Sequence, residues 1–255
     1  MSIKIIDTHC HLDMEEFDND REDVIKRSKD GGIKAVIMPS TTEEDYDKEK
    51  SLCDEYNGFL FYFVGIHPHD AKTCTHSTYD TAINHLDNKS CVGIGEIGLD
   101  YYYEHSPKNI QKDVFNNFLD IAIEKNLPVS IHSRDATNDM VDILKTKKSL
   151  KGVIHCFSGE DELLKVGLEL GLFFGIGGVV TFKKSLLRKN IKNVPIEYMV
   201  LETDAPYLAP VPKRGKRNEP LYIDYVLNNI AELTNNDKEK IASVAYNNSK
   251  ALFGI

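Results

Sequence analysis

The chain has 255 residues, of which 41% are hydrophobic and 28% are charged, and its formal net charge is -9. This composition is typical of a globular protein with a hydrophobic core, and the acidic total excludes a protein that binds nucleic acid over its whole surface. The five cysteines are scattered and form no CxxC pair, so neither a disulfide framework nor a zinc ribbon is expected. Lys4 and Asp7 interrupt the apolar amino-terminal run, unlike in a signal peptide, and we expect a cytoplasmic protein.

Short β-rich stretches recur along the chain, and each is followed by a polar stretch with helical periodicity. The eight expected strands span residues 3–7, 33–40, 60–68, 90–100, 127–133, 151–158, 172–180 and 197–206. Helical patterns in which Gly or Asn closes the last turn include residues 20–32, 109–126 and 161–171. A basic loop at 209–220 and two closing helices within 224–253 complete the chain.

Eight apolar strands that alternate with helices predict a parallel sheet covered by helices. At this length the number eight favours a closed (β/α)₈ TIM barrel, and we expect a single domain over residues 1–255. The most apolar stretch, residues 170–180, is too short and glycine-rich to span a bilayer, so no membrane contact is expected. Because no exposed apolar seam stands out, we expect a monomer.

Polar residues recur near the carboxyl ends of the expected strands, where a parallel barrel carries its active site. They are His9, His11, His67, Glu96, Asp100, His132, His155, Glu202 and Asp204. Residues two apart in a strand point the same way, so His9 and His11 should face one side and Cys10 the other.

Burying so many titratable groups without a cation would cost several kcal/mol, so a metal site is favoured over core histidines. Imidazole and carboxylate ligands suit Zn²⁺, Mn²⁺ or Mg²⁺. Even four of these histidines and two of these carboxylates would be more ligands than one catalytic metal takes, so two metals bridged by a carboxylate are expected.

Six motifs occur in order along the chain: DTHCHLD, GIHPH, IGEIGLDYYY, PVSIHSRDA, HCFSG and LETDAPYLAP. Together they resemble the TatD-type metal-dependent deoxyribonucleases of the amidohydrolase superfamily, and the resemblance runs from Asp7 to the closing YNNSKALF. It implies a TIM barrel with two divalent metals. The ligands that it implies are His9, His11, Glu96 and Asp204 for the first metal, and His132 and His155 for the second, with Glu96 bridging.

The resemblance also implies hydrolysis of phosphodiester bonds in DNA, as a 3′-to-5′ exonuclease acting on single strands. Two cations can stabilise the charge that develops on the phosphate. Asp204 is the candidate that orients and deprotonates the attacking water, and Glu96 and His67 are the other catalytic candidates, with His67 resembling a phosphate-contacting histidine. His69 is either a supporting residue or a surface residue, and Glu202 is either a carboxylate that supports a ligand or a core glutamate with a cationic partner.

Several residues are candidates for contact with substrate. The loop after the eighth strand carries Lys213, Arg214, Lys216, Arg217 and Asn218, of which Arg214 and Asn218 are the leading candidates. Arg134 lies two residues after His132 and is a candidate phosphate contact. Tyr101 and Tyr103 are candidates for stacking on an unpaired base, whereas Tyr102 is either a stacking residue or a hydrophobic cap of the barrel. No sequence-reading motif is present, so nonspecific DNA binding is expected.

Two other readings stay open. The same barrel and metals suit an amidohydrolase or a deacylase acting on mischarged tRNA, although the basic loop favours a phosphate-rich substrate. The other alternative is a metal-bound scaffold without activity, and the complete set of metal ligands argues against it.

Overall fold

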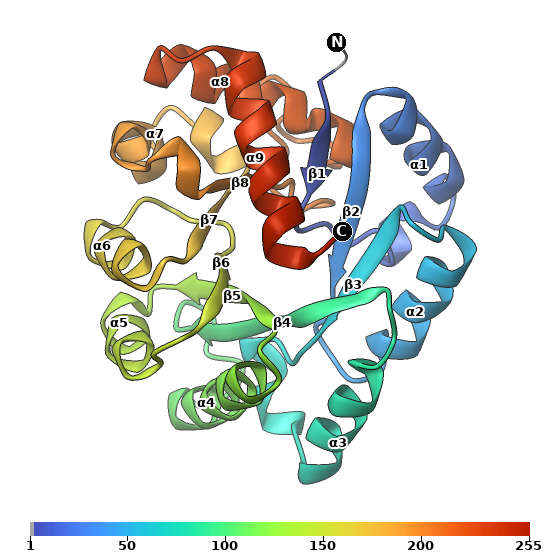
Figure 1. The fold of residues 1–255 in the computed structure, drawn as a ribbon, viewed down its shortest axis with the longest axis vertical. Helices are drawn as coiled ribbons and strands as arrows, with labels where there is room; N and C mark the ends of the chain where they lie inside the picture. The colour runs from blue at the N-terminus through green and yellow to red at the C-terminus, as the bar shows by residue number, and fades with distance from the viewer. Residues whose placement is uncertain (1–2) are drawn as a thin grey trace. The chain divides into compact units, whose positions relative to one another are not determined.

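A computed structural model describes residues 3–255 of the chain. Eight strands form one sheet in the order β1 to β8, and β1–β2, β3–β4, β4–β5, β5–β6 and β7–β8 pair in parallel. The strands are β1 Ile5–Asp7, β2 Ile33–Pro39, β3 Leu60–Val64, β4 Cys91–Asp100, β5 Pro128–Arg134, β6 Lys151–Ile154, β7 Phe173–Ile176 and β8 Met199–Leu201 (Figure 1). The expected (β/α)₈ fold is therefore confirmed.

The helices alternate with the strands, and two follow the last strand. They are α1 Arg21–Asp30, α2 Asp45–Glu55, α3 His76–His85, α4 Lys108–Lys125, α5 Thr137–Thr146, α6 Asp161–Leu170, α7 Leu186–Asn190, α8 Ile223–Thr234 and α9 Lys238–Phe253. Asn126 ends α4 and Asn235 ends α8 in the left-handed conformation, at φ 56° and 53°, which asparagine tolerates better than most residues. Within residues 3–255, every helix is too short or too polar to cross a lipid bilayer.

Several strands are shorter at their carboxyl ends than the sequence predicts. His9, His67, His155 and Glu202 each lie beyond the last residue of their strand, whereas Glu96 lies within β4. Two or three residues past two of these ends, φ is positive, 45° at Cys156 and 56° at Asp204, which takes the backbone out of the extended conformation. His9, His67, His155 and Glu202 therefore stand at the starts of loops.

The contacts divide the chain into two compact units. Unit 1 comprises residues 3–38, Cys156–Glu160 and Phe174–Ile255, and so carries β1, β8, α1 and α7 to α9. Unit 2 comprises Pro39–His155 and Asp161–Phe173, and carries β3 to β6 and α2 to α6. Each unit has its own buried apolar side chains, such as Phe17 and Leu227 in unit 1 and Phe63 and Phe118 in unit 2. The single domain expected over residues 1–255 stays a prediction.

An ion-pair network in unit 1 ties α1 to the loop that precedes α8. Arg217 donates to both carboxylate oxygens of Asp20, at 2.7 and 2.8 Å. Arg27 lies 3.2 Å from Asp20 and 2.5 Å from Glu219. The Arg217 guanidinium also lies over the ring of Phe17, 4.4 Å from its centroid. This network fixes one end of the basic loop to α1.

Replacing Asp20 with asparagine is expected to lower the free energy of unfolding by about 1 kcal/mol at neutral pH, a figure reduced for the partial exposure of the site. The hydrogen bond from Arg217 lowers the pKa of Asp20 to about 2. Because the folded pKa is below the ordinary 3.8, this stabilisation is present above pH 3.8 and is lost as the pH falls towards 2. Urea denaturation from pH 6 to pH 3 measures it.

Glu22→Gln removes an exposed carboxylate two residues away, in the first turn of α1, and is the matched control. An Asp20→Asn deficit that stays constant over the acidic range would contradict this prediction.

Candidate metal centre

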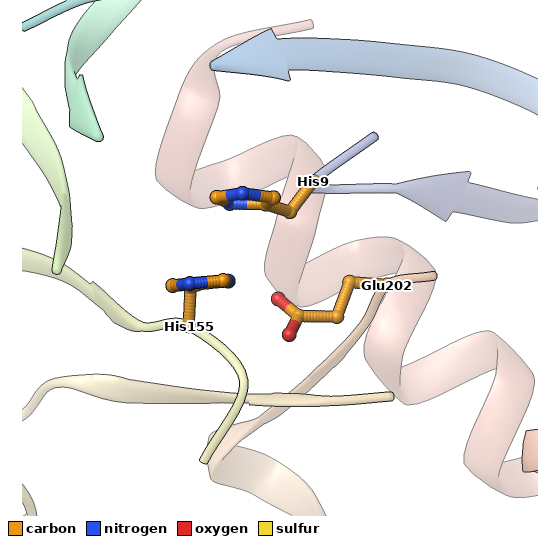
Figure 2. A group of neighbouring side chains, drawn as sticks. All are labelled: His9, His155 and Glu202. Carbon is orange, nitrogen blue, oxygen red and sulfur yellow. The ribbon is translucent and has the colours of Figure 1, made fainter. Parts of the chain in front are cut away.

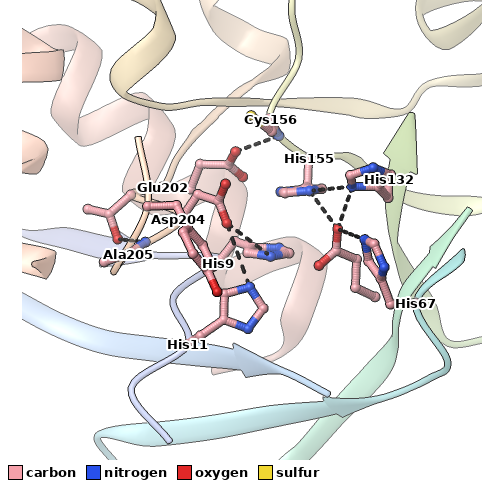
Figure 3. Close-up of polar contacts among 12 residues, drawn as sticks. His9, His11, His67, His132, His155, Cys156, Glu202, Asp204 and Ala205 are labelled. Carbon is pink, nitrogen blue, oxygen red and sulfur yellow. Dashed lines mark hydrogen bonds and ion pairs between the residues drawn. The ribbon is translucent and has the colours of Figure 1, made fainter. Parts of the chain in front are cut away.

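Two histidines and an aspartate converge in unit 1. His9 and His11 follow β1 and are buried, and Asp204 follows β8. Asp204 Oδ1 lies 3.8 Å from His9 Nε2 and 3.6 Å from His11 Nε2, and the two rings meet edge to face (Figure 3). Such N···O distances are long for hydrogen bonds but suit ligand atoms that share one ion at about 2.1 Å each. His9 and His11 thus face the same side, as the sequence predicts.

The backbone around this group is held by Asp7, the last residue of β1. Its Oδ1 accepts the backbone N–H of Thr203 at 2.9 Å, and its Oδ2 accepts the Thr203 hydroxyl at 2.6 Å. The backbone N–H of Asp204 donates to the carbonyl of His9 at 2.9 Å. Burial raises the pKa of Asp7 to about 8, against the effect of the hydrogen bonds it accepts. Protein contacts therefore join the segment after β1 to the segment after β8.

Glu202 lies beside His9 in unit 1. It is fully buried, and its Oε1 accepts the backbone N–H of Cys156 at 2.5 Å. A carboxylate oxygen of Glu202 and a ring nitrogen of His9 lie within 4.8 Å of each other (Figure 2). The sequence leaves two interpretations of Glu202 open. Its position favours a carboxylate that supports a metal ligand over a core glutamate with a cationic partner.

Replacing Gly175 with alanine is expected to displace Glu202 and to destabilise the protein by about 1–3 kcal/mol. A Cβ at Gly175 would lie 2.1 Å from Glu202 Oε2 and 2.6 Å from its Cδ. Denaturation in urea measures the loss. Gly177→Ala is the matched control, because its Cβ would meet Glu202 no closer than 3.5 Å, and a change within about 0.5 kcal/mol is expected there. Equal losses in the two variants would contradict this role for Gly175.

Three histidines of unit 2 surround one oxygen. Glu96 Oε1 lies 2.7 Å from His132 Nδ1 and 2.8 Å from His155 Nε2. It lies 3.6 Å from His67 Nε2. The two nitrogens of His132 and His155 that face the carboxylate are 3.3 Å apart. Imidazole nitrogens that converge with a buried carboxylate oxygen are the donor set of a divalent metal site.

Asp100, at the end of β4, holds His132 from its other side. Asp100 Oδ2 lies 3.2 Å from His132 Nε2 and 3.0 Å from His69 Nε2. Burial disfavours the charged form of Asp100, but hydrogen bonds from His132 and from the backbone of Tyr103 outweigh it, and the pKa of Asp100 is below its ordinary value. A carboxylate that accepts from the far nitrogen of a histidine fixes the ring orientation and tautomer for metal binding.

The family follows from the sequence as a whole. Residues 6–254 match the family described as TatD related DNase. The chain belongs to this family.

Its relatives include both uncharacterised and named proteins. An uncharacterized metal-dependent hydrolase of Bacillus subtilis, YabD, is 39% identical, with 98% of this chain and 99% of the relative covered. The 3′-5′ ssDNA/RNA exonuclease TatD of Pantoea ananatis is 31% identical, with 98% and 100% covered. The crystal structure of YJJV, a TatD homolog from Escherichia coli, has a TM-score of 0.93 at 29% identity, and all of each chain is covered. The family resemblance seen in the motifs is thus confirmed.

In this TatD-family chain each cluster has the donors of a metal site on its own. Unit 1 supplies two buried imidazoles and a carboxylate, and unit 2 supplies three imidazoles and a carboxylate. In unit 2, ligand atoms of His67, Glu96 and His132 all lie within 4.8 Å of one another. The number of ions and the assignment of ligands to each remain predictions.

The tyrosines after β4 differ in exposure from one another. Tyr101 donates its hydroxyl to Asp139 at 2.6 Å, and the Lys108 ammonium lies over its ring at 4.5 Å. Tyr102 and Tyr103 are the exposed members, at 57% and 52%. Tyr102 and Tyr103 therefore have exposed rings, whereas the hydroxyl and ring of Tyr101 contact Asp139 and Lys108.

Residues of the basic loop are largely engaged with the protein itself. Asn218 is fully buried and donates its amide to the carbonyls of Thr203 and Tyr207, both at 2.8 Å. The Arg214 guanidinium lies over the ring of Phe182 at 4.0 Å. Asn218 therefore stabilises the conformation of the loop, and we do not propose it as a substrate contact.

Sequence reasoning places Asp100 at a strand end but assigns it no contact. Its partners lie on other segments: His69 follows β3, and His132 lies in β5. The signal in the sequence is its position four residues after Glu96 in a strand whose other buried residues are apolar or glycine.

Proposed function

We propose that this TatD-family protein hydrolyses phosphodiester bonds in DNA and removes nucleotides from the 3′ end of single strands, with two bound divalent metal ions. The observation that carries the proposal is the convergence of His132 Nδ1 and His155 Nε2 on Glu96 Oε1. Relatives at 31% identity that are named 3′-5′ ssDNA/RNA exonucleases support the substrate.

We assign ligands to the ions by cluster. His9, His11 and Asp204 would hold the first ion, and His132 and His155 the second, with Glu96 shared as the resemblance implies. When bound, Mg²⁺, Mn²⁺ or Zn²⁺ supplies positive charge that stabilises the phosphate in the transition state. The long N···O distances around Asp204, 3.6 and 3.8 Å, support a role in binding a cation rather than in hydrogen bonding alone.

Three side chains would act on the substrate and the water. Asp204 orients and deprotonates the attacking water through its carboxylate. His67, which is 12% exposed and lies at the edge of the unit 2 cluster, would donate to the phosphate. Arg134 is exposed at the end of β5 and presents a guanidinium, the preferred partner of phosphate. Arg214, in the loop before α8, would be a second arginine that contacts phosphate. A monomer in the cytoplasm is the setting that we expect.

Digestion of end-labelled single-stranded DNA tests the proposal, with duplex DNA and RNA in parallel and with Mg²⁺, Mn²⁺ or Zn²⁺ added in turn. We expect stepwise shortening from the 3′ end that is abolished by a chelator and by Asp204→Asn. Shortening from the 5′ end would contradict the polarity. A lack of cleavage with all three metals would contradict the nuclease and leave the amidohydrolase or deacylase alternative.

A chromogenic phosphodiester separates an enzyme from a metal-bound scaffold. Turnover that depends on added metal and falls in Asp204→Asn is the expected result. Turnover that survives in this variant would contradict the assignment of Asp204.

A further inference from the structure

Exposed aromatic rings cluster on the loop that follows β4. The rings of Tyr103 and His105 lie parallel, with an interplanar angle of 4° and centroids 5.4 Å apart. Tyr102 packs against Tyr103 edge to face at 4.7 Å. All three residues are exposed, so part of each ring is accessible to a ligand in solution.

A cation completes this surface. The Arg134 guanidinium carbon lies 4.0 Å from the ring centroid of Tyr102 and 4.9 Å from that of Tyr103. Arg134 is itself exposed. A planar guanidinium stacks on aromatic faces and also pairs with phosphate, so the surface offers both kinds of contact that a nucleotide needs.

The loop that carries the rings is fastened by buried groups. Asp100 Oδ1 accepts the backbone N–H groups of Tyr102 and Tyr103, at 3.0 and 3.1 Å. Buried Gln111 donates to the carbonyls of Asp100 and Ser106, at 3.0 and 2.8 Å, and so closes the loop from behind. A binding surface that is already ordered loses less conformational entropy on binding than a mobile one.

A row of rings connects this surface to the metal cluster of unit 2. The ring of His69 lies 5.5 Å from that of Tyr103 and 4.4 Å from that of His67. His67 in turn lies 4.6 Å from His132. The same Asp100 that fixes the tyrosines also contacts His132 through its other oxygen, at 3.2 Å. The rings therefore have a fixed position relative to a proposed metal ligand.

We propose that Tyr102, Tyr103, His105 and Arg134 form a stacking platform for unpaired nucleobases, which binds the strand whose phosphodiester is cleaved. The inference rests on the proposed function and names the part of the substrate that this surface recognises. Every base has a π face, so stacking tolerates any sequence. Bases in a duplex are stacked on their neighbours, and the platform therefore favours single strands.

Binding of fluorescently labelled oligonucleotides, measured by anisotropy in the presence of a chelator, tests the platform without requiring turnover. The probes are an oligothymidylate and an abasic strand of the same length and charge. We expect wild-type protein to prefer the strand that carries bases. In Tyr103→Ala this preference should fall about tenfold, the size of effect expected for the loss of one stacked base, and Tyr103→Phe should retain it.

Tyr246→Ala is the matched control, because it removes a half-buried tyrosine of α9 that also has a lysine ammonium near its ring, at 5.9 Å. We expect it to keep the wild-type preference. A loss of equal size in Tyr246→Ala, or an unchanged preference in Tyr103→Ala, would overturn the platform.

The outcomes also separate the platform from the proposed nuclease. Cleavage of DNA together with a base preference that does not depend on Tyr103 would overturn the platform alone. A base preference that depends on Tyr103 in a protein that cleaves no strand would support the platform and overturn the proposed function. An oligouridylate is tested in parallel, and a loss of affinity for both strands in Tyr103→Ala would support recognition of the pyrimidine ring rather than of the deoxyribose.

Discussion

Replacing Glu96 with glutamine is expected to lower turnover of a phosphodiester about 10³-fold, which corresponds to about 4 kcal/mol of transition-state stabilisation. The variant keeps the size of the side chain but removes the charge of an oxygen that lies 2.7 Å from His132 Nδ1 and 2.8 Å from His155 Nε2. Because a neutral amide binds a divalent cation much more weakly than a carboxylate does, metal affinity should fall as well. Isothermal titration with Mn²⁺ or Zn²⁺ measures the affinity, and a chromogenic ester measures the turnover.

Glu160→Gln serves as the control for Glu96. Glu160 is also a carboxylate that accepts a hydrogen bond, from the Ser158 hydroxyl at 2.5 Å, but it is not one of the proposed metal ligands. We expect wild-type metal affinity in this variant. Full metal binding and full turnover in Glu96→Gln would refute the role of Glu96 as a ligand.

Replacing Asp100 with asparagine is expected to weaken metal binding by about 10–100-fold. The asparagine oxygen can still accept from the backbone of Tyr102 and Tyr103, so the loop keeps its anchor. Its amide, however, presents a donor where His132 Nε2 now faces the acceptor Oδ2 at 3.2 Å. The imidazole would lose the partner that fixes its orientation. Titration of the metal-free protein with Mn²⁺ or Zn²⁺ measures this effect directly.

Asp139→Asn is the control for Asp100, since Asp139 also accepts from a residue of the tyrosine run, the hydroxyl of Tyr101 at 2.6 Å. It contacts Lys112 rather than a histidine. Equal metal affinity in Asp100→Asn and Asp139→Asn would show that Asp100 does not position His132.

Much of the fold and of the two clusters could be predicted from the sequence, because both depend on local patterns. Apolar runs that alternate with helical periodicity are sufficient to place eight parallel strands. A histidine or carboxylate directly after such a run lies at the carboxyl end of a strand, where parallel topology gathers side chains. His9 and His11 near Asp204, and His132 and His155 near Glu96, follow from this rule.

The remaining features depend on partners that are distant in sequence. In the sequence, Arg217 resembles a solvated arginine of a loop. In the structure it pairs with Asp20, which lies 197 residues earlier in the chain. The exposure of Tyr102 rather than Tyr101 depends on Asp139, which lies 38 residues beyond Tyr101 in α5. No local periodicity encodes such pairings, so the sequence predicts the charge or the ring but not its availability.

Under the proposed function, the network around Asp20 affects how steeply added salt would weaken the binding of a single strand. A cation adds to the salt dependence of nucleic-acid binding only if it displaces condensed counterions from a phosphate, with a slope of about 0.7 per contact for single strands. Arg217 is held by both oxygens of Asp20, so that its charge is already neutralised within the protein. A count of arginines in the loop would therefore overstate the steepness with which added salt releases a bound strand.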